Sequence, residues 1–265
     1  MDSQGYQNDI DALAACGPLK AWSVIVTIMG DLCRSPEDSI SGPILSLLVS
    51  RLGISNQALR VALHRLRRDG WIRTEKEGRT SHHFISEHGW EKTRSVRSIV
   101  YPKDIPENIP VYFVLAPPSV AAPDFSELMP DDSILLSPRE AIVPDSADGL
   151  PEDFLVFSFC PSDLPVWLEN LVAPCELRLD YSRLANLLEA ILEKKVPLGI
   201  DEATVLRLIV LHQWRRLRLR HGPLPDLLLS SDWEGARARR LVGRAIITFE
   251  VPRISTLGRQ NKTAG

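Results

Sequence analysis

The sequence lacks the patterns that identify metal-binding and disulfide-rich proteins. It has only four cysteines, Cys16, Cys33, Cys160 and Cys175, and no two of them form a CxxC pair. We therefore expect no zinc site, no other metal site and no disulfide framework. We interpret the cysteines as free thiols in or near hydrophobic cores.

Long apolar runs are also missing. No run approaches the roughly 18 residues of a membrane-spanning helix, so we expect no contact with a membrane. The N-terminal stretch MDSQGYQNDIDALAACG is acidic and lacks the basic start and apolar core of a secretory signal. These two absences predict a cytoplasmic protein.

Motifs of catalysis are absent as well. The sequence shows no carboxylate pair at catalytic spacing, no nucleophile elbow and no phosphate-binding loop. A metal-dependent nuclease, the main enzymatic alternative, would need a cluster of acidic residues at ligand spacing. We therefore expect that the protein is not an enzyme and needs no cofactor.

Charge is present but unevenly distributed, although the net charge is only −3. Residues 51–103 carry a net charge of +7 and residues 104–175 carry −12, while residues 1–50 and 176–265 carry −4 and +6. The basic segments point to a nucleic acid or another polyanion as partner. A solvated charged surface without a partner is the alternative.

Residues 21–68 have the pattern of three helices joined by short turns. The near-continuous apolar character of Ala21–Met29 predicts a buried helix. Ser41–Pro43 predicts the start of a second helix, which Gly53 ends. Ser55 is a natural N-cap for the third helix.

The third helix is amphipathic and basic. At 100° per residue its apolar stripe consists of Leu59, Ala62, Leu63 and Leu66. The opposite face consists of Gln57, Val61, His64 and Arg68, flanked by Arg60, Arg65 and Arg67. Two helices joined by a short turn that contains glycine, the second helix basic, form a helix-turn-helix whose second helix enters the major groove of DNA.

A β-hairpin is predicted directly after these helices. The stretch WIRTEKEGRTSHHFIS alternates apolar and polar residues, turns at Glu77–Arg79 and returns through Thr80–Ile85. A helix-turn-helix followed by a basic hairpin predicts a winged helix. His82 and His83 point to opposite faces of a strand, so we interpret them as polar hairpin residues and not as metal ligands.

The predicted winged helix would bind double-stranded DNA. Glutamine and arginine read base edges, and Arg79 at the hairpin tip can grip a phosphate bidentately. The candidate DNA-binding residues are Ser55, Asn56, Gln57, Arg60, Val61, His64, Arg65, Arg67, Arg68, Arg79 and Thr80. Winged helices also serve as protein-interaction modules, and this alternative stays open.

Several of these stretches resemble one known family. WSVIVTIMGDLC, SNQALRVALHRLRRDGWI and EGRTSHHFIS resemble the N-terminal domain of PaaX-type repressors, which regulate phenylacetic acid degradation. LIVLHQWRRLRLRHGPLPDLLLSSDWEGARARRLVGRAI resembles the C-terminal part of the same family. The resemblance covers about residues 20–103 and 154–250.

The resemblance implies a regulator of an aromatic-acid catabolic pathway. It implies a homodimer that represses from a near-palindromic operator and is released by an aryl-acyl coenzyme A effector. His212, Trp214, Arg215 and Arg216 would then form a pocket wall, because arginines suit the coenzyme A phosphates. Two alternatives remain: Trp214 in the core with surface arginines, and a ligand-insensitive regulator.

The middle of the chain departs from the family pattern. Strands are expected at Val111–Ala116, Ser133–Leu136, Ala141–Val143 and Phe154–Cys160, and helices at Phe125–Leu128 and Ser162–Leu171. The resemblance implies a ferredoxin-like domain here, but the helix is shortened and the family's arginines are missing.

The fold class that we expect is a multidomain α+β protein. A winged helix-turn-helix domain at 18–103 precedes a reduced ferredoxin-like α+β domain at 104–175. A helical domain at 176–254 and a flexible tail at 255–265 complete the chain.

Overall fold

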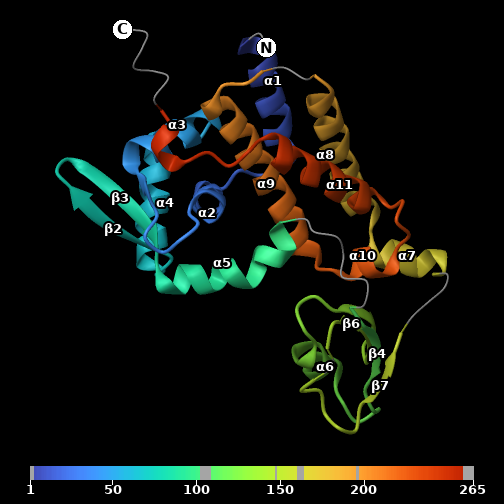
Figure 1. The fold of residues 1–265 in the computed structure, drawn as a ribbon. Coiled ribbons are helices and arrows are strands. Elements are labelled where there is room, and N and C mark those ends of the chain that lie inside the picture. The colour runs from blue at the N-terminus through green and yellow to red at the C-terminus, as the bar shows by residue number, and fades with distance from the viewer. Residues whose placement is uncertain (1–2, 102–108, 147, 160–163, 195–196, 259–265) are drawn as a thin grey trace. The chain divides into compact units, whose positions relative to one another are not determined.

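The computed structural model describes residues 3–101, 109–146, 148–159, 164–194 and 197–258 (Figure 1). The fold is α+β and contains two small antiparallel sheets. The chain divides into two compact units. Unit 1 comprises residues 1–102, 183–216 and 240–265, and unit 2 comprises residues 103–182 and 217–239. The three expected domain ranges remain a prediction.

Unit 1 is mainly helical. The N-terminal part of this unit, up to residue 102, contains the helices α1 (Ser3–Ala14), α2 (Ala21–Leu32), α3 (Gly42–Arg51), α4 (Asn56–Arg68) and α5 (Glu87–Val100). Three later helices contain residues of both units, namely α8 (Cys175–Glu193), α9 (Ile200–His221) and α11 (Glu234–Thr248). A short 3-10 helix, η1, follows at Ile254–Thr256.

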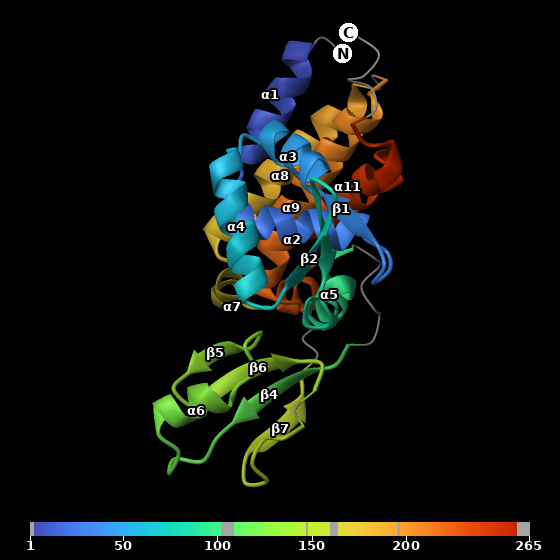
Figure 2. The same ribbon diagram turned by 90° about the vertical axis from the view of Figure 1, so that its left-hand side faces the viewer.

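The core of unit 1 is built around α2. Its apolar run is buried as the sequence predicts, and Val24, Ile25 and Ile28 are fully enclosed. Figure 1 shows α2 between α4 and α9, and Figure 2 shows α3 and α4 from the side that carries the hairpin. The α3–α4 segment therefore rests on a helix that is itself bonded to α9.

The sequence did not predict α1 or the short strand β1 (Ser39–Ser41) of unit 1. Tyr6, Ile10 and Leu13 are buried along α1, at the i, i+4, i+7 spacing of an apolar helix face. The strand β1 pairs with β3 (Thr80–Ile85), which pairs in turn with β2 (Ile72–Glu77). The predicted hairpin is thus part of a three-stranded antiparallel sheet.

Unit 2 contains a four-stranded sheet in the order β5-β6-β4-β7. Its elements are β4 (Val111–Leu115), α6 (Ala122–Leu128), β5 (Ile134–Ser137), β6 (Glu140–Pro144), β7 (Leu155–Ser158), α7 (Val166–Val172) and α10 (Leu224–Leu228). Phe125 of α6 packs with Val114 and Val143 in one cluster. Leu168 of α7 and Leu224 of α10 pack with Ile142 in another.

The expected strands in the middle of the chain form, with shifted ends, but the ferredoxin-like arrangement is not confirmed. Every strand pairing in this sheet is antiparallel, and β6 lies between β4 and β5, as in a split βαβ unit, whose two parallel strands are not neighbours. Within the described residues, however, no helix joins β6 to β7. The predicted strand end at Cys160 and helix start at Ser162 lie outside the described residues.

The family-like motif PLPDLLLSSDW has a structural role in unit 2. Asp226 is buried and accepts a hydrogen bond from Trp233 Nε1 at 3.1 Å. Arg218 and Arg239 both pair with the same carboxylate. One acid therefore holds α9, α10 and α11 residues together.

Two expectations need correction. The tail predicted at 255–265 is wrong at its start, because Leu257 is buried and the Gly258 N–H donates to Asp201 at 3.1 Å; residues 259–265 lie outside the described residues. Cys16 and Cys33 are buried, but Cys175 is exposed. His83 is a polar hairpin residue as expected, but it is buried, with Nδ1 2.9 Å from Thr74 Oγ1 across the hairpin.

Candidate nucleic-acid interface

The candidate interface begins with α4, whose two faces differ as the sequence predicts. Its apolar stripe, Leu59, Ala62, Leu63 and Leu66, is buried. Gln57, Arg60, Val61, His64, Arg65, Arg67 and Arg68 are all exposed. Val61, on the same face, has a relative exposure of 65%. The helix thus presents a basic face with one apolar residue within it.

The start of α4 is fixed by two of the candidate residues. The Ser55 hydroxyl caps the helix and accepts a hydrogen bond from the Ala58 N–H at 3.2 Å. The Asn56 side chain accepts a hydrogen bond from Ser46 of α3. Ser55 therefore fixes the first turn of α4, Asn56 joins α4 to α3, and both side chains are exposed at the turn.

The arginines of α4 differ in how far their charge is compensated. Arg65 and Arg68 pair with Asp69, Nε to carboxylate oxygen, at 3.4 and 3.0 Å. The hydrogen bond from Arg68 lowers the pKa of Asp69 below its ordinary value. Within the described chain, Arg60 and Arg67 have no acidic partner. Uncompensated positive charge therefore extends from the first turn toward the last.

The hairpin places Arg79 at its tip. Gly78 has φ +59°, the conformation that a two-residue hairpin loop requires and that glycine adopts without strain. Arg79 is exposed and has no acidic partner among the described residues, and Thr80 pairs with Glu77 at the start of β3.

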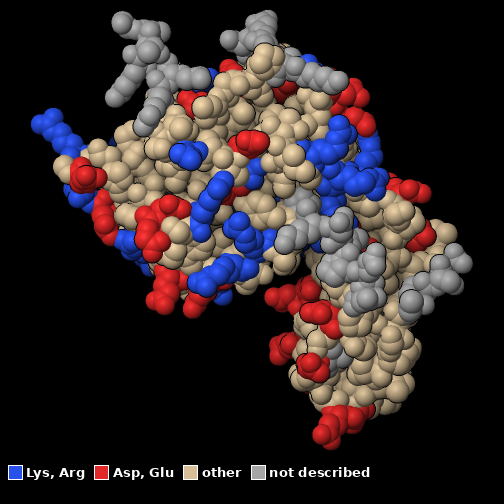
Figure 3. Space-filling view, in the orientation of Figure 1, with Lys and Arg blue, Asp and Glu red and all other residues tan. Residues whose placement is uncertain are grey.

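The hairpin is less basic than its tip. Arg73 pairs with Glu75, and His82 Nε2 lies 3.5 Å from the Glu77 carboxylate. In the antiparallel register both glutamates share the face of Arg73, opposite the buried His83. Figure 3 accordingly shows basic and acidic side chains side by side in the region of the hairpin. The prediction of a basic hairpin was based on Arg79 at the tip and did not consider Glu75 and Glu77.

The four residues expected to bind an effector all lie on α9. At 100° per residue His212, Arg215 and Arg216 share one side of the helix, and Trp214 points to the opposite side. His212 is buried, with Nδ1 3.3 Å from Thr27 Oγ1, and Trp214 lies in the core. Arg216 donates to the Cys16 carbonyl oxygen at 2.9 Å. Of the four, Arg215 lines a cavity.

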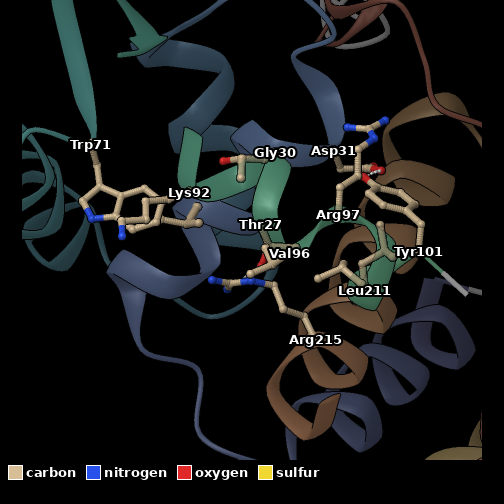
Figure 4. Close-up of a pocket in the computed structure, with 13 residues that line it drawn as sticks. Thr27, Gly30, Asp31, Trp71, Lys92, Val96, Arg97, Tyr101, Leu211 and Arg215 are labelled. Carbon is tan, nitrogen blue, oxygen red and sulfur yellow. Dashed lines mark hydrogen bonds between the residues drawn. The ribbon is translucent and has the colours of Figure 1, made fainter. Parts of the chain in front are cut away.

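That cavity lies between α2, α5 and α9 within unit 1 (Figure 4). Its lining residues are Val26, Thr27, Gly30, Asp31, Trp71, Lys92, Thr93, Val96, Arg97, Val100, Tyr101, Leu211 and Arg215. Apart from Arg215, the sequence did not indicate this set, because four stretches far apart in the chain contribute to it. The one available signal was Asp31, an acid inside an otherwise apolar helix.

Asp31 is compensated by a buried network at one end of the cavity. Arg207 donates to both carboxylate oxygens at 2.7 and 2.9 Å, and to the Phe249 carbonyl oxygen at 2.9 Å. Tyr101 donates its hydroxyl to the same carboxylate at 2.8 Å. Burial, and then the charge of Asp31, raise the pKa of the Tyr101 phenol above its ordinary value. This network joins α2, α5 and α9 and supports the wall of the cavity.

The described residues contain no cluster of three or more potential metal ligands. Among the same residues, no helix combines the length and apolar character that crossing a bilayer requires.

Comparisons with known proteins agree with the resemblance seen in the sequence. The solved structure of an uncharacterized protein, Rv0674 from Mycobacterium tuberculosis, is similar in fold, with a TM-score of 0.51 and 16% identity. The match covers 89% of this chain and 98% of that one. The transcriptional repressor PaaX of Escherichia coli (strain K12) is 23% identical over 248 residues, which cover 84% of this chain and 78% of the repressor.

Family models match both terminal parts of the chain. A PaaX-like protein model matches residues 20–89, and a PaaX-like protein C-terminal domain model matches residues 175–251. Because these two matches together span more than half of the chain, the protein belongs to the PaaX-like family.

Proposed function

We propose that this protein is a transcriptional regulator that binds double-stranded DNA as a winged helix-turn-helix. In this proposal α4 enters the major groove and the β2–β3 hairpin lies against the backbone. The observation that carries it is the basic, exposed face of α4 opposite a fully buried apolar stripe. Family membership points to a regulator and not to an enzyme.

Residues near the start of α4 are proposed to read the sequence. Gln57 can bond the edge of adenine, and Arg60 can bond guanine bidentately. The exposed Val61 suits contact with a thymine methyl group. The remaining candidates, Arg67, Arg68 and Arg79 among them, suit phosphate contacts, which position the protein without reading sequence.

We further propose that the protein is a repressor that acts as a homodimer on two half-sites. An aryl-acyl coenzyme A thioester from an aromatic-acid pathway would release it from DNA. Such a ligand shifts the equilibrium only by its differential affinity for the bound and the released states. The effector contacts of His212, Trp214, Arg215 and Arg216 remain a prediction.

A second candidate function is a protein-interaction module, or a regulator that no ligand controls. Glu75 and Glu77 favour the interaction module, because two exposed acids on the hairpin would repel phosphates.

Selection of binding sites from random DNA, with and without aryl-acyl coenzyme A thioesters, separates these functions. We expect an enriched near-palindromic site whose occupancy falls when one thioester is added. Enrichment that no thioester changes would favour the ligand-insensitive regulator. No enrichment at low salt would contradict DNA binding and favour the interaction module.

A further inference from the structure

The cavity between α2, α5 and α9 combines apolar walls with an excess of positive charge. Val26, Val96, Val100 and Leu211 supply the apolar surface. Figure 4 shows Trp71 and Lys92 at one end, Asp31 and Tyr101 at the other, and Arg215 extending from α9 toward Thr27 and Val96 between them. The cavity is small and partly open, so it suits a compact group and not a cofactor-sized molecule.

Arg215 is the unexplained charge in this cavity. Its Nη1 donates to neutral oxygens only, to Ser23 Oγ at 3.2 Å and, at 3.5 Å, to the Ser23 carbonyl and Thr27 Oγ1. Burial lowers the pKa of this arginine. The nearby acid, Asp31, is already paired with Arg207 and Tyr101. Within the described chain Arg215 therefore has no anion to offset its desolvation.

From this geometry we infer that the cavity is a binding site for a compact apolar carboxylic acid. The carboxylate pairs with the Arg215 guanidinium, whose planar group of donors matches it. The hydrocarbon body lies against the valines of α2 and α5 and against Leu211. This ligand differs from the coenzyme A thioester of the proposed function. The free acid carries a negative carboxylate that can pair with Arg215, whereas the acyl group of a thioester is neutral.

The site lies where α5 meets the base of the β2–β3 hairpin, so a bound ligand can shift the hairpin. Trp71, the residue before β2, lines the cavity, and its carbonyl oxygen accepts from the Ser86 N–H at 3.0 Å. A Cβ on Gly89 would lie 2.3 Å from the same oxygen, so the first turn of α5 is seated directly on the base of the hairpin. A ligand there touches α5 and Trp71 on one side and α2 and α9 on the other.

Calorimetric titration of the full chain tests the site. The probe is phenylacetate, its neutral control is phenylacetamide, and its larger counterpart is phenylacetyl-coenzyme A. We expect the acid to bind, and the amide to bind about 10–100-fold more weakly, because it cannot form the charged pair. Equal affinity for acid and amide, or binding of the thioester alone, would overturn the inference.

Variants assign the binding to the cavity. Arg215→Gln should weaken phenylacetate by about 10–100-fold, whereas Arg220→Gln, an exposed arginine of the same helix, should not change it. Val96→Phe fills the cavity without removing the charge and should also abolish binding. Circular dichroism shows whether each variant folds. Wild-type affinity in folded Arg215→Gln or Val96→Phe would refute the site.

Only the regulatory consequence rests on the proposed function. If the acid changes the affinity for the selected DNA, the DNA must change the affinity for the acid by the same factor. Binding of phenylacetate without any DNA binding would leave the site standing and remove the proposed function. DNA binding with no heat from phenylacetate would remove the site and leave the proposed function standing.

Discussion

Two arginines of α9, eight residues apart, are in opposite electrostatic states. Arg207 is buried and bonds both oxygens of Asp31 and a backbone carbonyl oxygen. Arg215 is half-buried and bonds neutral oxygens only. A buried ion that loses its partner is costly, whereas removing an ion that lacks one relieves desolvation. The two positions should therefore respond differently to the same substitution.

We expect Arg207→Met to lower the free energy of unfolding by about 3–5 kcal/mol, because it leaves Asp31 buried without its main partner. Arg215→Met should change it by less than about 1 kcal/mol in either direction, since only bonds to neutral oxygens are lost. Urea unfolding monitored by circular dichroism measures both. Similar losses at the two positions would contradict the assignment of Arg215 to a ligand.

Buried histidines make stability depend on pH. Burial lowers the pKa of both His83 and His212 to about 4, from 6.5 in the unfolded chain. The unfolded chain therefore binds more protons between these values. Stability that is present above pH 6.5 should be lost as the pH falls toward 4, by up to about 3 kcal/mol for each histidine.

Urea unfolding across this pH window measures the loss. His83→Gln should reduce the slope, while substitution of His88, which is exposed, should leave it unchanged. A free energy of unfolding that stays constant between pH 6.5 and 4 would show that neither imidazole is held neutral.

At the scale of elements, the joint between the hairpin and α5 depends on one glycine. A Cβ on Gly89 would meet the Trp71 carbonyl oxygen at 2.3 Å, and this backbone atom cannot move aside without shifting α5. We expect Gly89→Ala to cost about 1–3 kcal/mol of stability. Gly243→Ala in α11 meets no atom within 4 Å and should instead stabilise by about 0.5–1 kcal/mol. Thermal unfolding distinguishes the two, and a neutral Gly89→Ala would contradict the close contact.

We propose that α4 reads base edges and that the β2–β3 hairpin contacts phosphates. Substitutions in each element test these two roles separately. Gln57→Ala and Arg60→Ala should each lose about 1–3 kcal/mol of binding at particular base pairs. Arg79→Ala should weaken binding to every sequence alike and flatten its salt dependence, because one phosphate contact is removed. Fluorescence anisotropy with a set of mutated operators at several salt concentrations measures both effects. Arg183, exposed on α8, provides the control substitution.

At the scale of the whole molecule, the proposed regulator should bind its operator as two chains. Two-fold symmetry would place the half-sites about one helical turn of DNA apart, or a multiple of it. Light scattering of the protein with the selected operator should give two chains per duplex. A single chain bound with full affinity would contradict the homodimer.

The local elements of this chain follow from local sequence. The Ser55 cap, the apolar stripe from Leu59 to Leu66 and the tight turn at Gly78 each depend on residues a few positions apart, so their spacing predicts them. The family-like motifs correctly indicated the PaaX-like family. In the acidic middle segment, residue patterns predicted the strands but not which strands pair, since pairing depends on contacts between residues far apart in the chain.

Only the tertiary structure decided which arginines of α9 have an acidic partner and which residues line the cavity. Asp31 and Arg207 are 176 residues apart, and no spacing in the sequence links them. His212, Trp214, Arg215 and Arg216 are neighbours in the chain, yet the helix turns Trp214 away from the other three, and Arg215 lines the cavity. Sequence thus determined which helix carries an exposed basic face, because that depends on periodicity within one element. Only packing decided which arginine keeps an uncompensated charge, because that depends on which distant side chains come into contact with it.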